Sequence, residues 1–297
     1  MQTMNQPQLG ASRKALQETY PIQDQYSSNY LAFERAADPL PTLQYRPSQN
    51  WIHPTDRAAQ TDCLLQTDSY SIHLVSTLKQ RIKASTLIKR MYASRGYQTD
   101  SASVFSAIPF QYTFEARCGQ RIIGTLTLTI DSNNGLLADT LYQSELDQFR
   151  EQGHKPCEVS KLAFAPNSSS KEIFAALFHI AYLYAHVLHD AQDAFIEINP
   201  RHMSFYRRML GFCQIGQQQT CPRVNAPAVL LHLDLEYMGA QITAMAGQLR
   251  QREKSIYPLF LTRSEEEGVI QRMQPEKTIT HTQRKCNTDT RLSLART

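Results

Sequence analysis

Apolar and polar positions follow different patterns in three successive parts of the chain. Residues 1–68 are rich in Gln, Ser, Asp and Pro and show no sustained periodicity, which predicts a poorly ordered or wrapping arm. Residues 69–240 carry strand-like alternation and helix-like spacing in turn, so we expect one folded domain there. Residues 241–297 continue with helix-like spacing and become polar, which predicts a helical extension and a tail.

The order of elements in the middle part predicts the fold. Gly119 and Gln120 separate two β-rich runs and indicate a tight hairpin. Ser169 and Glu172 have the spacing of a capping box, which predicts the start of a long buried helix. The sum is one mixed α/β sheet with helices on both faces. Expected strands are 70–75, 112–118, 121–131, 158–164, 194–198, 212–215 and 228–235, and expected helices are 78–92, 144–152, 171–189, 202–210, 236–252 and 265–273.

Composition narrows the function classes. Only 11 of the 297 residues are glycine, and neither GxGxxG nor GxxxxGK[ST] occurs, so glycine-rich nucleotide cradles have no local support. Lysine and arginine number 31 against 27 acidic residues, and the net charge of +4 does not by itself indicate nucleic acid.

Cysteine usage and hydropathy indicate the cellular compartment of the protein. The six cysteines form no CxxC pair, no apolar leader segment follows Met1, and no uncharged apolar run reaches the ~18 residues of a membrane span. We therefore expect a reduced, cytoplasmic protein whose lipid contacts involve a substrate or the membrane surface.

Three short sequence segments contain the residues that indicate a chemical function. Residues 158–166 are EVSKLAFAP on the expected central strand, residues 199–202 are NPRH, and residues 205–212 are FYRRMLGF. Together they resemble the GNAT acyltransferase superfamily. Over about 71–241 the chain resembles its long-chain N-acyl amino acid synthase family, which is related to the acyl-homoserine-lactone synthases. The resemblance implies a GNAT-like sheet and an N-acyltransferase that moves a long-chain acyl group from acyl carrier protein, or acyl-CoA, to the α-amine of an amino acid.

The loop after the central strand departs from the pattern of the acetyl-CoA members. Those members hold the CoA pyrophosphate on a glycine-rich loop at a helix N-terminus, whereas residues 166–171 here are PNSSSK. The resemblance therefore implies a donor recognised through the acyl-4'-phosphopantetheine arm of a carrier protein, with no permanently bound cofactor. Lys161 stands where the lactone synthases have arginine, which weakens the alternative of a lactone synthase. A non-catalytic relative that binds acyl groups or carrier proteins is the alternative from another class.

Glu158 is the candidate base, because a partly buried carboxylate has a raised pKa suited to deprotonating an amine. The alternative is a structural pair with Lys161. Side chains three apart on a strand point to opposite faces unless a bulge intervenes, and the resemblance implies such a bulge. Tyr206 is either the acid that protonates the leaving sulfur, as the resemblance implies, or a core aromatic. The candidates for binding the thioester oxygen are the main-chain N–H groups of Leu162, Ala163 and Phe164.

Further residues are candidates for holding the donor and the acceptor. A basic face would attract an acidic carrier protein, although exposed basic residues can equally form a solvated surface, and Asn199 can serve as a helix cap. Apolar side chains between the sheet halves would enclose the acyl chain or form ordinary core. Asp131 would hold the ammonium group of the amino acid or cap a turn. The donor-binding candidates are Lys161, Asn199, Arg201, Arg207 and Arg208, and the acyl-pocket candidates are Phe114, Leu126, Leu128, Phe174 and Phe178.

Histidine spacing raises a metal hypothesis. His179, His186 and His189 fall near one face of the expected helix, but no HExxH motif or cysteine pair completes a site, so we expect no metal.

Overall fold

The structure is a computed structural model that describes residues 62–100, 102, 104, 109–168, 170–248 and 254–273. Nearly all of the expected arm and the expected tail from residue 275 lie outside these residues. Among the described residues, no helix is long and apolar enough to cross a bilayer.

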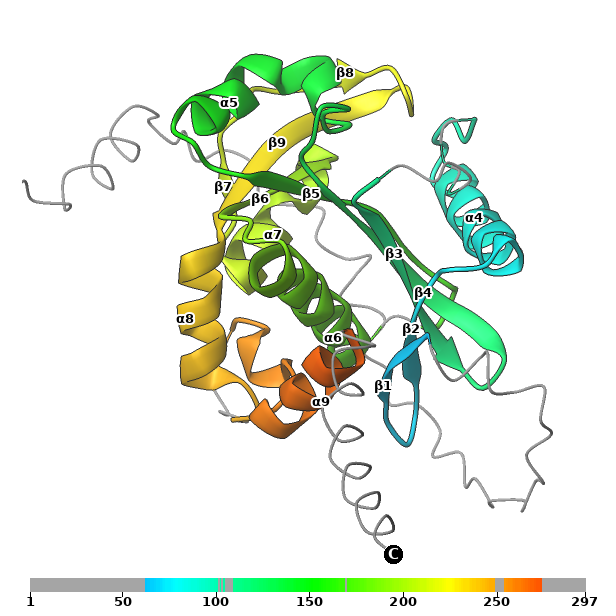
Figure 1. Cartoon of the computed structure of the whole chain (residues 1–297). Coiled ribbons are helices and arrows are strands. Elements are labelled where there is room, and N and C mark those ends of the chain that lie inside the picture. Colours follow the sequence, from blue (N-terminus) through cyan, green and yellow to red (C-terminus); the bar gives the residue numbers. More distant parts are fainter. Residues whose placement is uncertain are drawn as a thin grey trace, which may run out of the picture. The chain divides into compact units, whose positions relative to one another are not determined.

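A single mixed sheet organises the described residues (Figure 1), in the order β1-β2-β3-β4-β5-β6-β9-β7 with β8 paired to β9. The pair β5–β6 is parallel and the other strand pairs are antiparallel. The strands are β1 (Cys63–Gln66), β2 (Ser71–Leu74), β3 (Gln111–Cys118), β4 (Arg121–Ile130), β5 (Pro156–Phe164), β6 (Asp193–Ile198), β7 (Cys213–Gln214), β8 (Gln219–Cys221) and β9 (Ala226–Asp234).

Helices cover both faces of this sheet, as the sequence pattern predicts. One face, which we call the α6 face, packs on α6, α7, α8 and α9 in a common apolar core, and the opposite α4 face packs on α4 and α5. The helices are α4 (Leu78–Ala93), α5 (Asp139–Glu151), α6 (Lys171–Tyr182), the π-helix η2 (Leu183–Leu188), the 3-10 turn η3 (Pro200–His202), α7 (Met203–Leu210), α8 (Leu235–Met245), the 3-10 turn η4 (Tyr257–Leu259) and α9 (Arg263–Met273).

Side-chain alternation on the strands explains the two faces. Leu126, Leu128 and Ile130 of β4 belong to the core on the α6 face. Thr125 and Thr127 alternate with them and therefore point to the α4 face, where both are fully buried. The α4 face of this part of the sheet is thus polar although it is covered.

Four local expectations are corrected. β1 lies inside the segment expected to be an arm and is the edge strand of the sheet. Helix α5 begins at Asp139, five residues before its expected start, and α8 ends at Met245. The N-cap of α6 is Ser170, whose hydroxyl accepts from the Ile173 amide, and with Ile173 at the third helical position this cap is not the capping box expected from Ser169, which lies outside the described residues.

The described part of the C-terminal extension is integral to the core. Ile256, Tyr257 and Phe260 are buried in the core on the α6 face. The Tyr257 hydroxyl donates to the Leu210 carbonyl, which ties η4 to the end of α7. We conclude that the folded unit extends beyond residue 240.

Candidate functional site

The parallel strands β5 and β6 separate after three paired residues. Their register runs Pro156↔Asp193, Cys157↔Ala194 and Glu158↔Phe195 and ends there. Beyond this point β5 pairs only with β4, and β6 pairs only with β9. Glu158 therefore occupies the last paired position beside an opening between two central strands.

A β-bulge distorts β5 directly after this position. The β4–β5 register shifts between Thr125↔Ala163 and Thr127↔Ser160, which places an extra residue on β5. Lys161 lies in the bulge with a φ of 52°, and its carbonyl accepts from the Thr125 hydroxyl. This geometry confirms the expected bulge.

The bulge also affects the environment of Lys161. Burial lowers the pKa of Lys161, and the nearby Glu158 carboxylate opposes that shift. The two groups thus interact electrostatically despite their spacing of three residues on one strand.

Glu158 is a buried carboxylate held by main-chain amides. Its side chain projects to the α4 face, and the residue is 2% exposed. Oε2 accepts from the amide of Leu137 at 2.6 Å and from that of Ala138 at 3.3 Å, in the loop that leads into α5. Burial raises the pKa of Glu158 to about 7, Glu197 adds to this, and Arg223 and the two amides oppose it. The carboxyl thus holds its proton to a higher pH than an exposed glutamate does.

Glu197 and Arg223 belong to the same cluster and were not expected from the sequence. Glu197 lies on β6 two residues after Phe195, so it shares the α4 face with Glu158. Arg223, in the turn between β8 and β9, donates from Nη2 to Glu197 Oε2 at 2.5 Å. A charged residue in the otherwise apolar strand AFIEI is unusual enough to have marked Glu197, whereas nothing local marks Arg223.

Tyr206, the candidate acid, is a buried phenol in the core on the α6 face. Tyr206 of α7 is buried among Phe174, Phe178 and Phe212 on the α6 face. Burial strongly raises its pKa, and Tyr92 of α4 raises it further. The Tyr206 phenol is thus a weak acid that keeps its proton at neutral pH.

The amide pattern of β5 decides which N–H groups face the opening. The Ala165 amide donates to the Ile123 carbonyl of β4 at 2.9 Å. Antiparallel pairing alternates, so the Ala163 amide also points toward β4, whereas the Phe164 amide points toward the side that β6 has left. Leu162 lies next to the bulge. Of the three amides expected to bind the thioester oxygen, the Phe164 amide is the one that points toward the opening.

The expected donor-binding residues fall into two places. Asn199 caps the turn η3 by accepting from the Arg201 amide at 3.2 Å, and Arg201 donates to the Tyr97 hydroxyl at 2.8 Å. Arg207 and Arg208 are exposed on the last turn of α7. They line a cavity of about 230 Å³ whose other walls come from α8 and η4, and no residue of the Glu158 cluster lines it.

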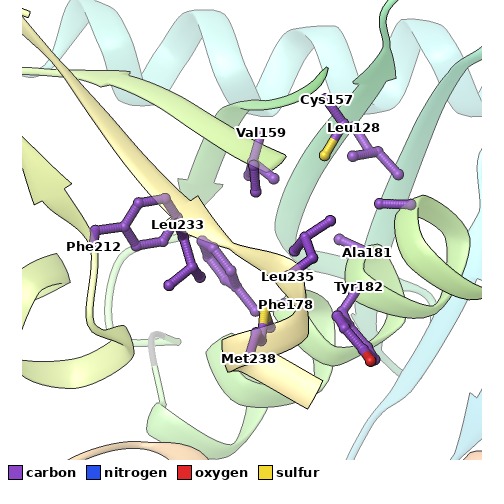
Figure 2. Close-up of a pocket in the computed structure, with 12 residues that line it drawn as sticks. Leu128, Cys157, Val159, Phe178, Ala181, Tyr182, Phe212, Leu233, Leu235 and Met238 are labelled. Atoms are coloured by element: carbon purple, nitrogen blue, oxygen red, sulfur yellow. The ribbon is translucent and has the colours of Figure 1, made fainter. Parts of the chain in front are cut away.

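An apolar cavity lies on the α6 face, beneath the paired end of β5 and β6, with Cys157 and Ala194 among its lining residues. Figure 2 shows Val159 and Cys157 of β5 above Phe178 of α6 and Met238 of α8. Its volume is about 20 Å³, room for roughly one water molecule. Of the expected acyl-pocket residues, Leu128 and Phe178 line this cavity, whereas Phe114, Leu126 and Phe174 lie in the core outside its lining.

Asp131 is engaged in an ion pair. Its two carboxylate oxygens accept from Arg150 at 2.6 and 3.1 Å, and Oδ1 also accepts from the Ser132 amide. The same guanidinium bonds Asp139. This geometry favours the turn-capping alternative for Asp131 over acceptor binding.

The three helical histidines have separate partners. His179 accepts from the Leu261 amide, His186 bonds the Ala191 carbonyl, and His189 bonds the Tyr112 hydroxyl. Within the described ranges no three His, Cys, Asp or Glu side chains are grouped as metal ligands.

Comparisons with known proteins identify the family. Residues 83–234, just over half of the chain, match the family model of the N-acyl amino acid synthase FeeM. The solved structure of FeeM, an N-acyl amino acid synthase from uncultured soil microbes, is 31% identical, with 59% of this chain and 95% of that chain covered and a TM-score of 0.54.

Other solved structures match at lower identity, and no curated protein matches. An acyl-CoA N-acyltransferase from Pseudomonas aeruginosa is 11% identical, with 55% of this chain and 97% of that chain covered and a TM-score of 0.41. The acyl-homoserine-lactone synthase LasI is 13% identical, with 56% and 90% covered and a TM-score of 0.42. On the family match and the FeeM structure, the chain belongs to the N-acyl amino acid synthase family and is an amide-forming N-acyltransferase with a GNAT-like fold.

Proposed function

We propose that this enzyme transfers a long-chain acyl group from acyl carrier protein to the α-amine of an amino acid, with acyl-CoA as the alternative donor. The observation that supports this most is the opening between β5 and β6 with the buried Glu158 carboxylate at its edge. A pantetheine arm is narrow enough to pass between two separated strands. The product is an N-acyl amino acid, a surfactant or a signalling lipid.

The residues around the opening supply each part of the reaction. Glu158 takes a proton from the acceptor ammonium, while its Oε2 is held by the amides of Leu137 and Ala138. The neutral amine attacks the thioester carbon, and the Phe164 amide stabilises the oxyanion. As the C–N bond forms and the C–S bond breaks, Tyr206 gives its proton to the sulfur. Glu158 passes this first proton to water and then takes the second proton that the attacking nitrogen loses as the amide forms. That second proton restores the Tyr206 hydroxyl.

The N-terminus of α6 argues for a carrier protein as donor. Ser170 already occupies the Ile173 amide, and Glu172 places a negative charge in the first turn of the helix. Both features disfavour a pyrophosphate there, since helix N-termini bind anions through free amides and a positive end. The enzyme then recognises the acyl donor through its pantetheine arm and through the surface of the carrier protein. Arg201, Arg207 and Arg208 are exposed and basic, as an acidic carrier requires.

The apolar cavity on the α6 face, which Val159 of β5 helps to line, marks the start of an acyl pocket. Its present volume does not hold a long chain, so Phe178 and Met238 must move when the chain enters. A donor on a carrier protein fits a cytoplasmic enzyme, and residues outside the described ranges remain candidates for peripheral membrane contact. We place the acyltransferase motifs within 69–240, and β1 and the helices after residue 240 belong to the same folded unit.

The experiment is product analysis with purified protein. Acyl carrier protein and CoA, each loaded with long chains, are offered with single amino acids, with and without S-adenosylmethionine, and products are identified by mass spectrometry. We expect N-acyl amino acids without S-adenosylmethionine. Lactone with release of methylthioadenosine would assign the lactone-synthase reaction, and carrier binding without turnover would point to a different substrate or a non-catalytic role.

A further inference from the structure

Arg223 connects three segments around Glu158. Its Nη2 donates to Glu197 Oε2 at 2.5 Å, and its Nη1 donates to the Leu137 carbonyl at 2.7 Å. The amide of the same Leu137 donates to Glu158 Oε2 at 2.6 Å. One guanidinium therefore holds the peptide segment that holds the carboxylate.

The turn that carries Arg223 is itself anchored. The Val224 carbonyl accepts from the Gln98 amide, just beyond α4. The Gln219 side chain bonds the Leu141 carbonyl of α5, and the Tyr142 hydroxyl donates to the carbonyls of Gln217 and Ala228. The β8–β9 hairpin is thus fixed to α5 and to the segment after α4, and it presents Arg223 in one place.

We propose that Arg223 is a positioning residue for Glu158, with Glu197 as its counterion, so that this pair sets the place and the charge state of the carboxylate. The inference rests on the proposed role of Glu158 as base. It gives Arg223 of the β8–β9 hairpin and Glu197 of β6 a role in positioning Glu158, although both lie outside the sequence motif of the central strand.

The charged groups that face Glu158 act in opposite directions. Glu197 from β6 raises its pKa, whereas Arg223 from the hairpin lowers it. Lys161 on β5 is also within electrostatic range, and Cys157 lies on the other side of the same strand. Neutralising Glu197 should therefore favour ionised Glu158, and neutralising Arg223 should favour protonated Glu158.

The test is the pH dependence of kcat/KM in R223Q, R223K and E197Q. The acidic limb of the profile reports the pKa of the base in the free enzyme. We expect R223Q to move this limb upward by about one pH unit and E197Q to move it downward by about the same amount. We expect R223K to keep the limb near its original position, because the charge remains. Its kcat should fall several-fold, since an ammonium lacks the fork that reaches both Glu197 and Leu137.

A purely structural role gives a different result. Loss of packing alone would lower kcat equally at every pH and leave the limb in place in all three variants, which would overturn the proposal. If R223Q does not fold, the downward shift in E197Q remains decisive, because a purely structural role would leave its limb in place. Carbon-13 NMR titration of the Glu158 carboxyl should show the same opposite shifts without substrate.

Two controls separate this inference from the proposed function. E158Q must lose the acidic limb. If the limb persists in E158Q, Glu158 is not the base and the proposed function fails at that step. If E158Q loses the limb while R223Q and E197Q leave it unmoved, only the positioning role fails. R263Q and E267Q, in an exposed ion pair on α9, are the matched controls and should leave the limb unchanged.

Discussion

Two buried glutamates on the same face of the sheet differ in one respect that separates a candidate site from a structural pair. Glu158 on β5 and Glu115 on β3 both project to the α4 face and are 2% and 0% exposed. Each has an arginine nearby, Arg223 and Arg117 respectively, and burial raises the pKa of each carboxyl. Burial, a cationic neighbour and a raised pKa therefore do not distinguish them.

The pairing of the neighbouring strands distinguishes Glu158 from Glu115. Glu115 lies between His73 of β2 and Thr125 of β4, and the pairing of both neighbouring strands continues past it. Glu158 lies between Thr129 of β4 and Phe195 of β6, and β6 departs immediately afterwards. A carboxylate can act on a substrate only where the sheet leaves room for one. The comparison teaches that strand separation carries the functional inference here.

The largest expected effect on turnover comes from neutralising Glu158, and neutralising Glu115 is the matched control. E158Q keeps the size of the side chain but cannot accept a proton, so we expect kcat to fall at least ~100-fold. E115Q should keep kcat within about two-fold, because no opening reaches that carboxyl. Steady-state turnover of both variants with one acyl donor and one amino acid checks this. Equal losses in the two variants would abolish the distinction between the two glutamates.

The second prediction concerns stability and uses only the folded protein. A folded-state pKa of about 7 against an unfolded value near 4.5 means that the native state holds its proton longer as pH rises. Glu158 therefore costs no stability below pH 4.5, and its cost grows to about 3 kcal/mol above pH 7. Relative to the wild type, E158Q should gain about this much stability between pH 4 and pH 8.5.

Urea unfolding of wild type and E158Q at several pH values measures this difference. The Glu115 contribution is common to both proteins and cancels. A stability difference that stays constant with pH would show that Glu158 titrates as it does in the unfolded chain.

The central strand and its bulge could be foreseen, while the completed cluster could not. The alternating pattern locates β5, and the resemblance to the GNAT superfamily implies the bulge, without which Glu158 and Lys161 would point to opposite faces. Glu197 is 39 positions from Glu158 along the chain, and Arg223 is 65 positions away. Only the strand order β5-β6-β9 brings them together, and local spacing contains no information about that order.

The sequence also could not decide which of two neighbouring residues caps a helix, or which partner a side chain takes. Ser169 and Ser170 are both suitable caps, and only the path of the chain decides that Ser170 accepts from Ile173. Asp131 follows a strand and suits either a turn or an ammonium ligand, and the partner that decides between them, Arg150, comes from α5. β1 is only four residues long, which leaves too little periodicity to detect.

The third prediction tests whether the opening continues into an acyl pocket. Ala181 lines the apolar cavity, so A181L should fill it and lower kcat/KM for long-chain donors about ten-fold more than for short-chain donors. A176L adds the same methyl groups to a buried position of α6 outside the cavity lining and is the matched control. It should cost stability without changing the preference for chain length. An equal chain-length effect in both variants would place the acyl chain elsewhere.

The smallest expected effect concerns what approaches the opening from outside. Reversing two exposed charges on α7, in the double variant R207E/R208E, should raise KM for the acyl carrier protein donor about five-fold at low salt. The effect should vanish near 0.5 M salt, where charges on two surfaces are screened beyond about 4 Å. Donors too small to reach α7, such as a long-chain pantetheine thioester, should be unaffected. If the thioester is affected equally, the two arginines act on the chemistry or the fold, and the carrier protein docks on another surface.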